Sequence, residues 1–196
     1  MDRNQTPRLD PRRPLVLETR ELGRRPGSMR ETLLDVPAPE GLGLIDLIGV
    51  PVDAPLHLEL RLESVMEGVL VTADVTAPVV GQCGRCLEPI SDTAHVGFQE
   101  LYVYPEGGSG TDEDADESHV AGDLLDLEPA LRDAVVLALP LTPLCSPDCE
   151  GLCATCGERW AVLPDEHTHD VVDPRWSALQ DLMPAHGQQA TGPEEN

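Results

Sequence analysis

The chain has 196 residues, a formal net charge of −23 and only 3% aromatic residues. This length supports one domain with a hydrophobic core, which must be built mainly from Leu, Val and Ala. Residues 1–30 contain no continuous apolar segment followed by a small-residue cleavage site, and no apolar run of about eighteen residues occurs. We therefore expect a cytoplasmic protein that is neither secreted nor inserted in a membrane.

The charges are unevenly distributed along the chain. All thirteen basic residues are Arg; residues 1–30 hold eight of them with four acidic residues, whereas the rest of the chain holds five Arg and 32 acidic residues. Phosphate neutralisation by Lys and Arg supplies most of the affinity in nonspecific nucleic-acid binding. Any direct contact with RNA is therefore expected to use residues 1–30, which we interpret as a basic, partly flexible N-terminal arm.

Alternating apolar and polar residues predict several strands. The first is expected within residues 13–22, the second in residues 56–64, where every other residue is Leu, and the third in residues 69–79. Residues 93–104 predict a fourth strand. The pattern predicts one antiparallel meander with a buried and a solvated face, and we place segment 13–22 in the same sheet.

An acidic segment and a helix follow the strands. Residues 105–121 are rich in Gly, Asp, Glu and Ser, which predicts a disordered acidic loop. A helix is predicted to start at Asp126 or Glu128 and to end before Pro140. Four apolar residues share one face of this helix: Leu127, Leu131, Val135 and Leu139. We expect this face to cover the apolar side of the sheet.

The predicted fold class is α+β, with an antiparallel sheet backed by one helix and a C-terminal Cys-rich zinc-knuckle extension. Residues 31–143 are predicted to form the sheet and helix. Residues 144–183 are predicted to form the zinc-binding extension, which includes a short helix over residues 173–183. A disordered tail is predicted for residues 184–196.

Six cysteines and two histidines form the chemically distinctive part of the sequence. They are Cys83, Cys86, Cys145, Cys149, Cys153, Cys156, His167 and His169. Because a cytosolic chain is kept reduced, metal ligation is a better explanation of these cysteines than disulfide bonding. Eight ligands are the number needed for two tetrahedral zinc ions, so we expect one or two structural zinc ions.

The favoured partition gives each zinc two pairs of ligands. Cys83, Cys86, Cys145 and Cys149 form one group, because the predicted helix can return the chain to the hairpin tip. Cys153, Cys156, His167 and His169 form the other, because alternate residues of an extended segment project to the same side. The alternatives are one zinc held by the four cysteines of residues 145–156, and a pair of histidines that belongs only to a polar loop.

The motif Cys83-Gly84-Arg85-Cys86 also resembles the C-x-x-C of thioredoxin-like oxidoreductases. Such enzymes need the first Cys at a helix N-terminus, and Pro89 would fall inside that helix. Common nucleotide-binding, hydrolase and metalloprotease motifs are missing from the sequence. We therefore expect a protein without catalytic residues or a small-molecule substrate, and keep the thiol oxidoreductase as an alternative.

Three motifs in this order resemble the YceD family, the large ribosomal RNA subunit accumulation proteins. They are "CGRCLEP", "LALPLTPLCSPDCEGLCATCG" and "DPRWSAL", and the resemblance covers residues 75–182. Members of that family commonly carry C-x-C where this chain has His167-Thr168-His169. The resemblance implies a non-enzymatic bacterial role in ribosome assembly, which affects large-subunit ribosomal RNA.

Two mechanisms agree with this expectation. In the first, the basic arm binds large-subunit ribosomal RNA directly. In the second, the acidic body acts as an escort that shields a basic ribosomal protein until assembly, and the charge distribution favours this escort.

Overall fold

The computed structural model describes residues 9–105, 118–169 and 175. The chain divides into two compact units, residues 1–151 and residues 152–196. In the described part, the first unit contains all strands and the helix α1 (Glu128–Ala138), and the second contains the 3-10 helix η2 (Trp160–Val162). Of the candidate ligands in the predicted extension 144–183, Cys145 and Cys149 thus belong to the first unit, and the four that follow belong to the second.

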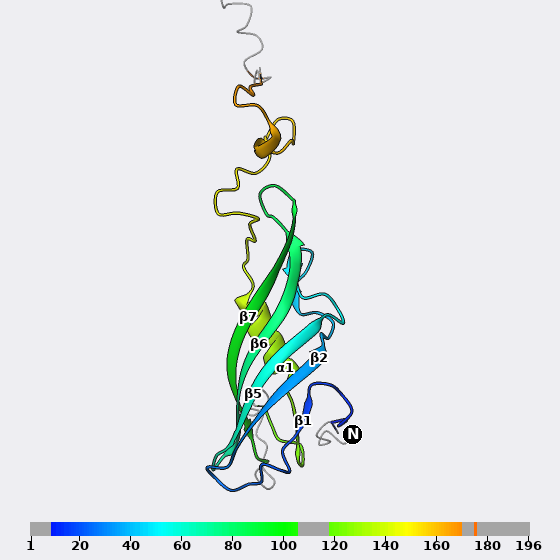
Figure 1. Cartoon of the computed structure of the whole chain (residues 1–196), viewed down its shortest axis with the longest axis vertical. Helices are drawn as coiled ribbons and strands as arrows, with labels where there is room; N and C mark the ends of the chain where they lie inside the picture. The colour runs from blue at the N-terminus through cyan, green and yellow to red at the C-terminus, as the bar shows by residue number, and fades with distance from the viewer. Residues whose placement is uncertain (1–8, 106–117, 170–174, 176–196) are drawn as a thin grey trace, which may run out of the picture. The chain divides into compact units, whose positions relative to one another are not determined.

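The main sheet of the first unit is antiparallel (Figure 1). Its strands are β2 (Met29–Pro37), β3 (Gly43–Leu44), β4 (Ile48–Gly49), β5 (Pro55–Ser64), β6 (Gly68–Gln82) and β7 (Pro89–Val103). The order is β2-β5-β6-β4-β3, and β7 pairs with the other side of β6. The β6–β7 hairpin pairs from Gly68↔Val103 to Gln82↔Pro89, so its closed end presents residues 83–88.

The core lies on one face of this sheet, as the alternation predicts. Leucines at every other position of β5 are buried, as are alternate residues of β6 from Val69 to Val79. Leu131 and Val135 of α1 are fully buried and belong to the same apolar cluster. The α+β class, the meander and the helix covering its apolar face are therefore confirmed.

Two strands differ from the expectation. Segment 13–22 contributes only β1 (Val16–Glu18), which pairs with β8 (Leu124–Asp126) in a separate two-stranded sheet, so its placement in the main sheet was wrong. Leu15 and Leu22 still pack in the core beside that small sheet. Strand β2 was not predicted, because its adjacent leucines interrupt the alternation and Leu33 is 77% exposed on an edge strand.

The end of the predicted acidic loop is packed against the sheet. His119 bridges to Val103, and Val120 is buried in the core, so the loop does not extend to residue 121. Burial of the apolar Val120 therefore fixes the chain to the first unit directly after the acidic segment. Residues 106–117 lie outside the described residues, as do the predicted tail and, apart from Arg175, the predicted helix over 173–183.

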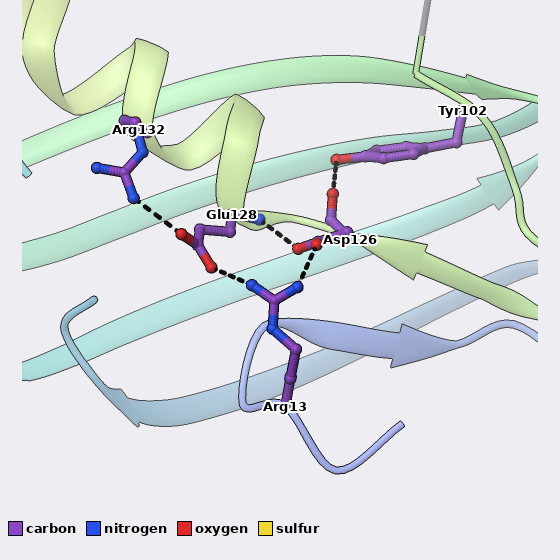
Figure 2. A network of polar contacts seen from close by, with 5 residues as sticks. All are labelled: Arg13, Tyr102, Asp126, Glu128 and Arg132. Atoms are coloured by element: carbon purple, nitrogen blue, oxygen red, sulfur yellow. Dashed lines mark hydrogen bonds and ion pairs between the residues drawn. The ribbon is translucent and has the colours of Figure 1, made fainter. Parts of the chain in front are cut away.

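A polar network joins the N-terminal segment to the start of α1 (Figure 2). The guanidinium of Arg13 donates to the carboxylates of Asp126 and Glu128, and Arg132 donates to the same Glu128 carboxylate at 2.8 Å. The hydroxyl of Tyr102 donates to the carbonyl oxygen of Asp126. This network and β1 connect part of the basic segment 1–30 to the rest of the first unit, and its partial flexibility stays a prediction.

Candidate metal centre

The first ligand pair lies in a tight loop at the end of the β6–β7 hairpin. The amide of Cys83 donates to the carbonyl of Glu88 at 2.8 Å, and the amide of Leu87 donates to the carbonyl of Cys83 at 2.9 Å. Leu87 adopts a φ of 61°, a left-handed conformation that strains a residue with a side chain. These hydrogen bonds shape the loop Cys83–Glu88, which we call knuckle 1.

The chain segment after α1 supplies the second ligand pair of this unit. The amide of Gly84 donates to the carbonyl of Pro143 at 2.8 Å, and the Arg85 guanidinium donates to the carbonyl of Cys149 at 2.8 Å. The helix therefore returns the chain to the hairpin tip, as predicted. This return brings Cys145 and Cys149 to knuckle 1.

The four sulfur atoms of the first unit form a compact group. The Sγ atoms of Cys83 and Cys149 are 3.8 Å apart, those of Cys86 and Cys145 are 3.6 Å apart, and all four lie within 4.8 Å of one another. A tetrahedral zinc ion with Zn–S bonds of about 2.3 Å needs sulfur–sulfur separations of roughly 3.8 Å. The donor set of this group, called site 1, therefore fits a four-coordinate metal ion.

The acidities of the site 1 thiols are strongly separated. The backbone amide of Cys86, followed by that of Cys145, lowers the pKa of Cys83 from 9.0 to about 6. Hydrogen bonding to the Cys86 side chain raises the pKa of Cys145 to about 12, and burial raises the pKa of Cys149. Neighbouring thiolates repel one another, so the four thiols of one site do not all ionise readily. A bound cation would compensate this repulsion.

The second unit contains a loop with the same backbone hydrogen bonds. The amide of Cys153 donates to the carbonyl of Glu158 at 2.7 Å, and the amide of Gly157 donates to the carbonyl of Cys153 at 2.9 Å. Gly157 has a φ of 75°, which is the position that Leu87 occupies in knuckle 1. We call the loop Cys153–Glu158 knuckle 2.

Two histidines complete a second group of four ligands, called site 2. The Sγ of Cys156 and the Nε2 of His167 are 3.6 Å apart, and the four ligand atoms lie within 4.8 Å of one another. Tetrahedral zinc with ordinary Zn–S and Zn–N bonds needs a sulfur–nitrogen separation of about 3.6 Å. The backbone amides of Cys156 and Thr155, followed by the His167 side chain, lower the pKa of Cys153 to about 6.

The structure groups all eight candidate ligands by the partition that the sequence analysis favoured. In the described part of the chain, the groups able to hold a metal are sites 1 and 2, so the group formed only by cysteines 145–156 is not found. All six cysteines are free thiols, and the C-x-x-C of knuckle 1 lies at a hairpin tip and not at a helix N-terminus.

Neither the similarity of the two knuckles nor the hydrogen bond from Arg85 to the Cys149 carbonyl was predicted from the sequence. A signal for the similarity was present, because "CGRCLE" and "CATCGE" share the pattern C-x-x-C-x-E. The glutamates contribute to the loops through their backbone carbonyls, so their side chains gave no chemical reason to align the two segments.

The fold and these ligand groups define a class, an antiparallel sheet protein whose Cys and His side chains could hold metal ions at two places. Residues 71–183 match the family model described as "Large ribosomal RNA subunit accumulation protein YceD". The chain therefore belongs to the YceD family, and this assignment confirms the resemblance seen in the sequence.

Several curated proteins are similar to the chain. An uncharacterized protein of Mycobacterium tuberculosis is 45% identical over 87% of this chain and 82% of its own length. An uncharacterized protein of Mycobacterium leprae is 42% identical over 87% and 78%, and the uncharacterized protein YlbN of Bacillus subtilis is 29% identical over 52% and 58%. No solved structure matches the chain significantly. Within the described residues, no helix is long and apolar enough to cross a membrane.

Proposed function

We propose that this protein is a non-enzymatic, cytoplasmic factor of ribosome assembly that supports the accumulation of large-subunit ribosomal RNA. The observation that carries the proposal is the family match over residues 71–183, which includes both knuckles and all eight candidate ligands. The family description names large ribosomal RNA subunit accumulation. Our proposal extends that description to this chain.

We further propose that each site holds one structural zinc ion. Site 1 would bind it with four thiolates and site 2 with two thiolates and two imidazoles, which are the ligands typical of structural zinc. Bound zinc would supply folding free energy at both sites. Because four protein ligands leave no open coordination position, this arrangement favours a structural role over catalysis.

The arginine contacts favour a protein partner over direct RNA binding by the N-terminal segment. Arg13, Arg20 and Arg30 form ion pairs with acidic residues of the same unit, and Arg24 lies 4.8 Å from the centre of the Tyr104 ring. In these contacts the guanidinium groups already interact with carboxylates or an aromatic ring, so they are less available to bind RNA phosphates. The escort for a basic ribosomal protein is therefore the mechanism that we favour.

Deletion of the gene in its bacterial host tests the proposed function. We expect the ratio of large-subunit to small-subunit ribosomal RNA to fall, and the parent gene to restore it. Complementation with Cys83→Ser should restore the ratio incompletely, while the exposed variant Met66→Ser serves as the matched control. An unchanged ratio in the deletion strain would contradict the proposal, and cell fractionation would test the location.

A further inference from the structure

A preformed apolar groove of about 660 Å³ lies where β4, the end of β6 and the start of β7 meet. Its lining is mainly apolar and includes Leu44, Leu47, Val50, Val80, Pro89 and Ile90. Val80 is 46% exposed, and Ile45, located between two lining residues, is 92% exposed. Exposed apolar surface of this kind is typical of a site that binds another molecule.

Small residues and a backbone hydrogen bond build this groove. A Cβ atom at Gly81 would lie 2.5 Å from the carbonyl oxygen of Leu47, so only glycine allows the two segments to approach this closely. The amide of Gln82 also donates to the Leu47 carbonyl at 3.0 Å. The walls are therefore fixed in the protein itself and do not require a partner to form.

The solvated face of the sheet, to which Val80 belongs, also carries acidic residues outside the groove. On β6, Asp74 and Val80 are separated by an even number of residues, so their side chains share the solvated face. Glu59 of β5 lies directly across from Asp74, and neither carboxylate forms an ion pair with another residue that the structure describes. Like charges in such a cross-strand pair reduce stability unless a cation compensates them.

The charges around the groove determine the kind of partner that fits it. Asp46 is the charged residue of the lining, and the lining contains no arginine. A phosphate backbone would be repelled by Asp46 and by the Glu59–Asp74 pair, whereas Lys and Arg side chains would relieve their repulsion. The apolar lining and the nearby carboxylates therefore complement a basic polypeptide that carries an apolar side chain.

We propose that this groove is the docking site for an extended basic segment of a protein partner. An apolar side chain of the segment occupies the groove, and its Lys or Arg side chains lie over Asp46 and the Glu59–Asp74 pair. Identification of the partner as a ribosomal protein rests on the proposed function, whereas the binding chemistry rests on the groove. Gln82 and Pro89 line the groove and flank knuckle 1, so site 1 lies next to the docking surface.

A peptide-binding experiment with the full zinc-loaded chain tests this inference. The probe is a fluorescent twelve-residue peptide of alternating Arg and Leu, compared with its Glu–Leu counterpart and a single-stranded RNA oligonucleotide. The test variant is Val80→Arg, and Met66→Arg, in the turn between β5 and β6, adds the same charge at a position 87% exposed. Circular dichroism and zinc content verify that both variants fold.

The parent should bind the Arg–Leu peptide more tightly than either comparison probe. Val80→Arg should weaken this binding at least about tenfold, because it fills the groove and adds a repulsive charge, whereas Met66→Arg should change it less than about twofold. The double variant Glu59→Gln/Asp74→Asn should also weaken binding and reduce its salt dependence. Equal binding by the parent and Val80→Arg, or tighter binding of RNA or of the Glu–Leu peptide, would overturn the inference.

Ribosomal RNA measurements separate this inference from the proposed function. If the RNA ratio falls in the deletion strain but Val80→Arg binds the peptide like the parent, the proposed function stands and the groove inference fails. If Val80→Arg loses peptide binding while the deletion strain has a normal RNA ratio, the groove inference stands and the proposed function fails.

Discussion

Knuckle 1 and knuckle 2 have the same backbone hydrogen bonds but very different surroundings. Knuckle 1 closes a hairpin whose strands are each fifteen residues long and whose inner face joins the apolar core. In residues 152–169, regular structure consists of the bridge Leu152↔Arg159 and η2, and Cys153 is the one buried side chain. The same local loop therefore occurs in a unit with an apolar core and in a segment that buries almost no apolar surface.

The candidate ligands of site 1 and site 2 also differ in burial. Cys83 and Cys86 are both buried, whereas Cys156 and His169 are exposed. Removal of metal should therefore affect the two units unequally, because the first unit retains its buried apolar surface.

Removal of zinc from the reduced protein should produce the largest difference between the units. Structural zinc contributes about 10–16 kcal/mol of apparent binding free energy in small zinc domains. We expect residues 152–169 to lose amide-exchange protection in a chelator while β5 and β6 keep theirs, and added zinc to restore it. Retained protection in residues 152–169 without metal would contradict this interpretation.

Substitution of both site 2 histidines should remove one zinc. His167→Ala/His169→Ala is expected to reduce the zinc content from two equivalents to one, as measured by native mass spectrometry. Acid titration of the parent should release zinc in two steps, because imidazole and thiolate ligands take up protons over different pH ranges, and the double variant should lose one step. A parent with one equivalent, unchanged by the substitutions, would show that the histidines are loop residues only.

A cavity in the core should affect the first unit alone. Leu131→Ala removes a fully buried side chain, and we expect it to lower the free energy of unfolding by about 2–5 kcal/mol. Denaturant unfolding of the zinc-loaded protein measures this loss, and Leu137→Ala on the exposed side of α1 is the matched control. Zinc affinity at site 2 should remain unchanged; a parallel loss there would mean that the two units fold together.

Metal-free protein should become more stable between about pH 6 and pH 9. The pKa of Cys83 is lowered to about 6, so its thiolate contributes stability that is complete above the ordinary pKa of 9.0 and is lost as the pH falls through 6. The raised pKa of Cys145 acts above that window and leaves the direction unchanged. Thermal unfolding of the reduced, chelated protein should show this rise, and Cys83→Ala should weaken it.

An exchange of one residue between the knuckles should have the smallest effect. Leu87→Gly relieves a left-handed conformation, and we expect it to stabilise the zinc-loaded protein by roughly 0.5 kcal/mol after the entropy of glycine is included. Gly157→Leu introduces the same strain in knuckle 2 and, by the same balance of strain and glycine entropy, should destabilise the second unit by roughly 0.5 kcal/mol. Zinc-competition titrations measure both changes, and effects of the opposite sign would show that the loops are not equivalent.

Elements with a local sequence pattern could be predicted before the fold was known. The alternate leucines of β5 predicted a half-buried strand, and Leu131 and Val135 predicted the buried face of α1, because these patterns follow from the geometry of one strand or helix. The cysteine and histidine spacing likewise identified the eight candidate ligands and the favoured partition. Metal binding itself remains a prediction from their chemistry.

Features that depend on contacts between residues distant in the sequence could not be predicted and are seen in the folded chain. Strand β1 precedes the strands of the main sheet in the sequence and β8 follows them, and the two pair in the folded chain. The ion pairs of Arg13 depend on that pairing. The edge position of β2 allows Leu33 to remain exposed, against its hydrophobicity. The groove at Gly81 is formed by three chain segments that pack together. The periodicity of each segment predicts its own secondary structure but not this packing.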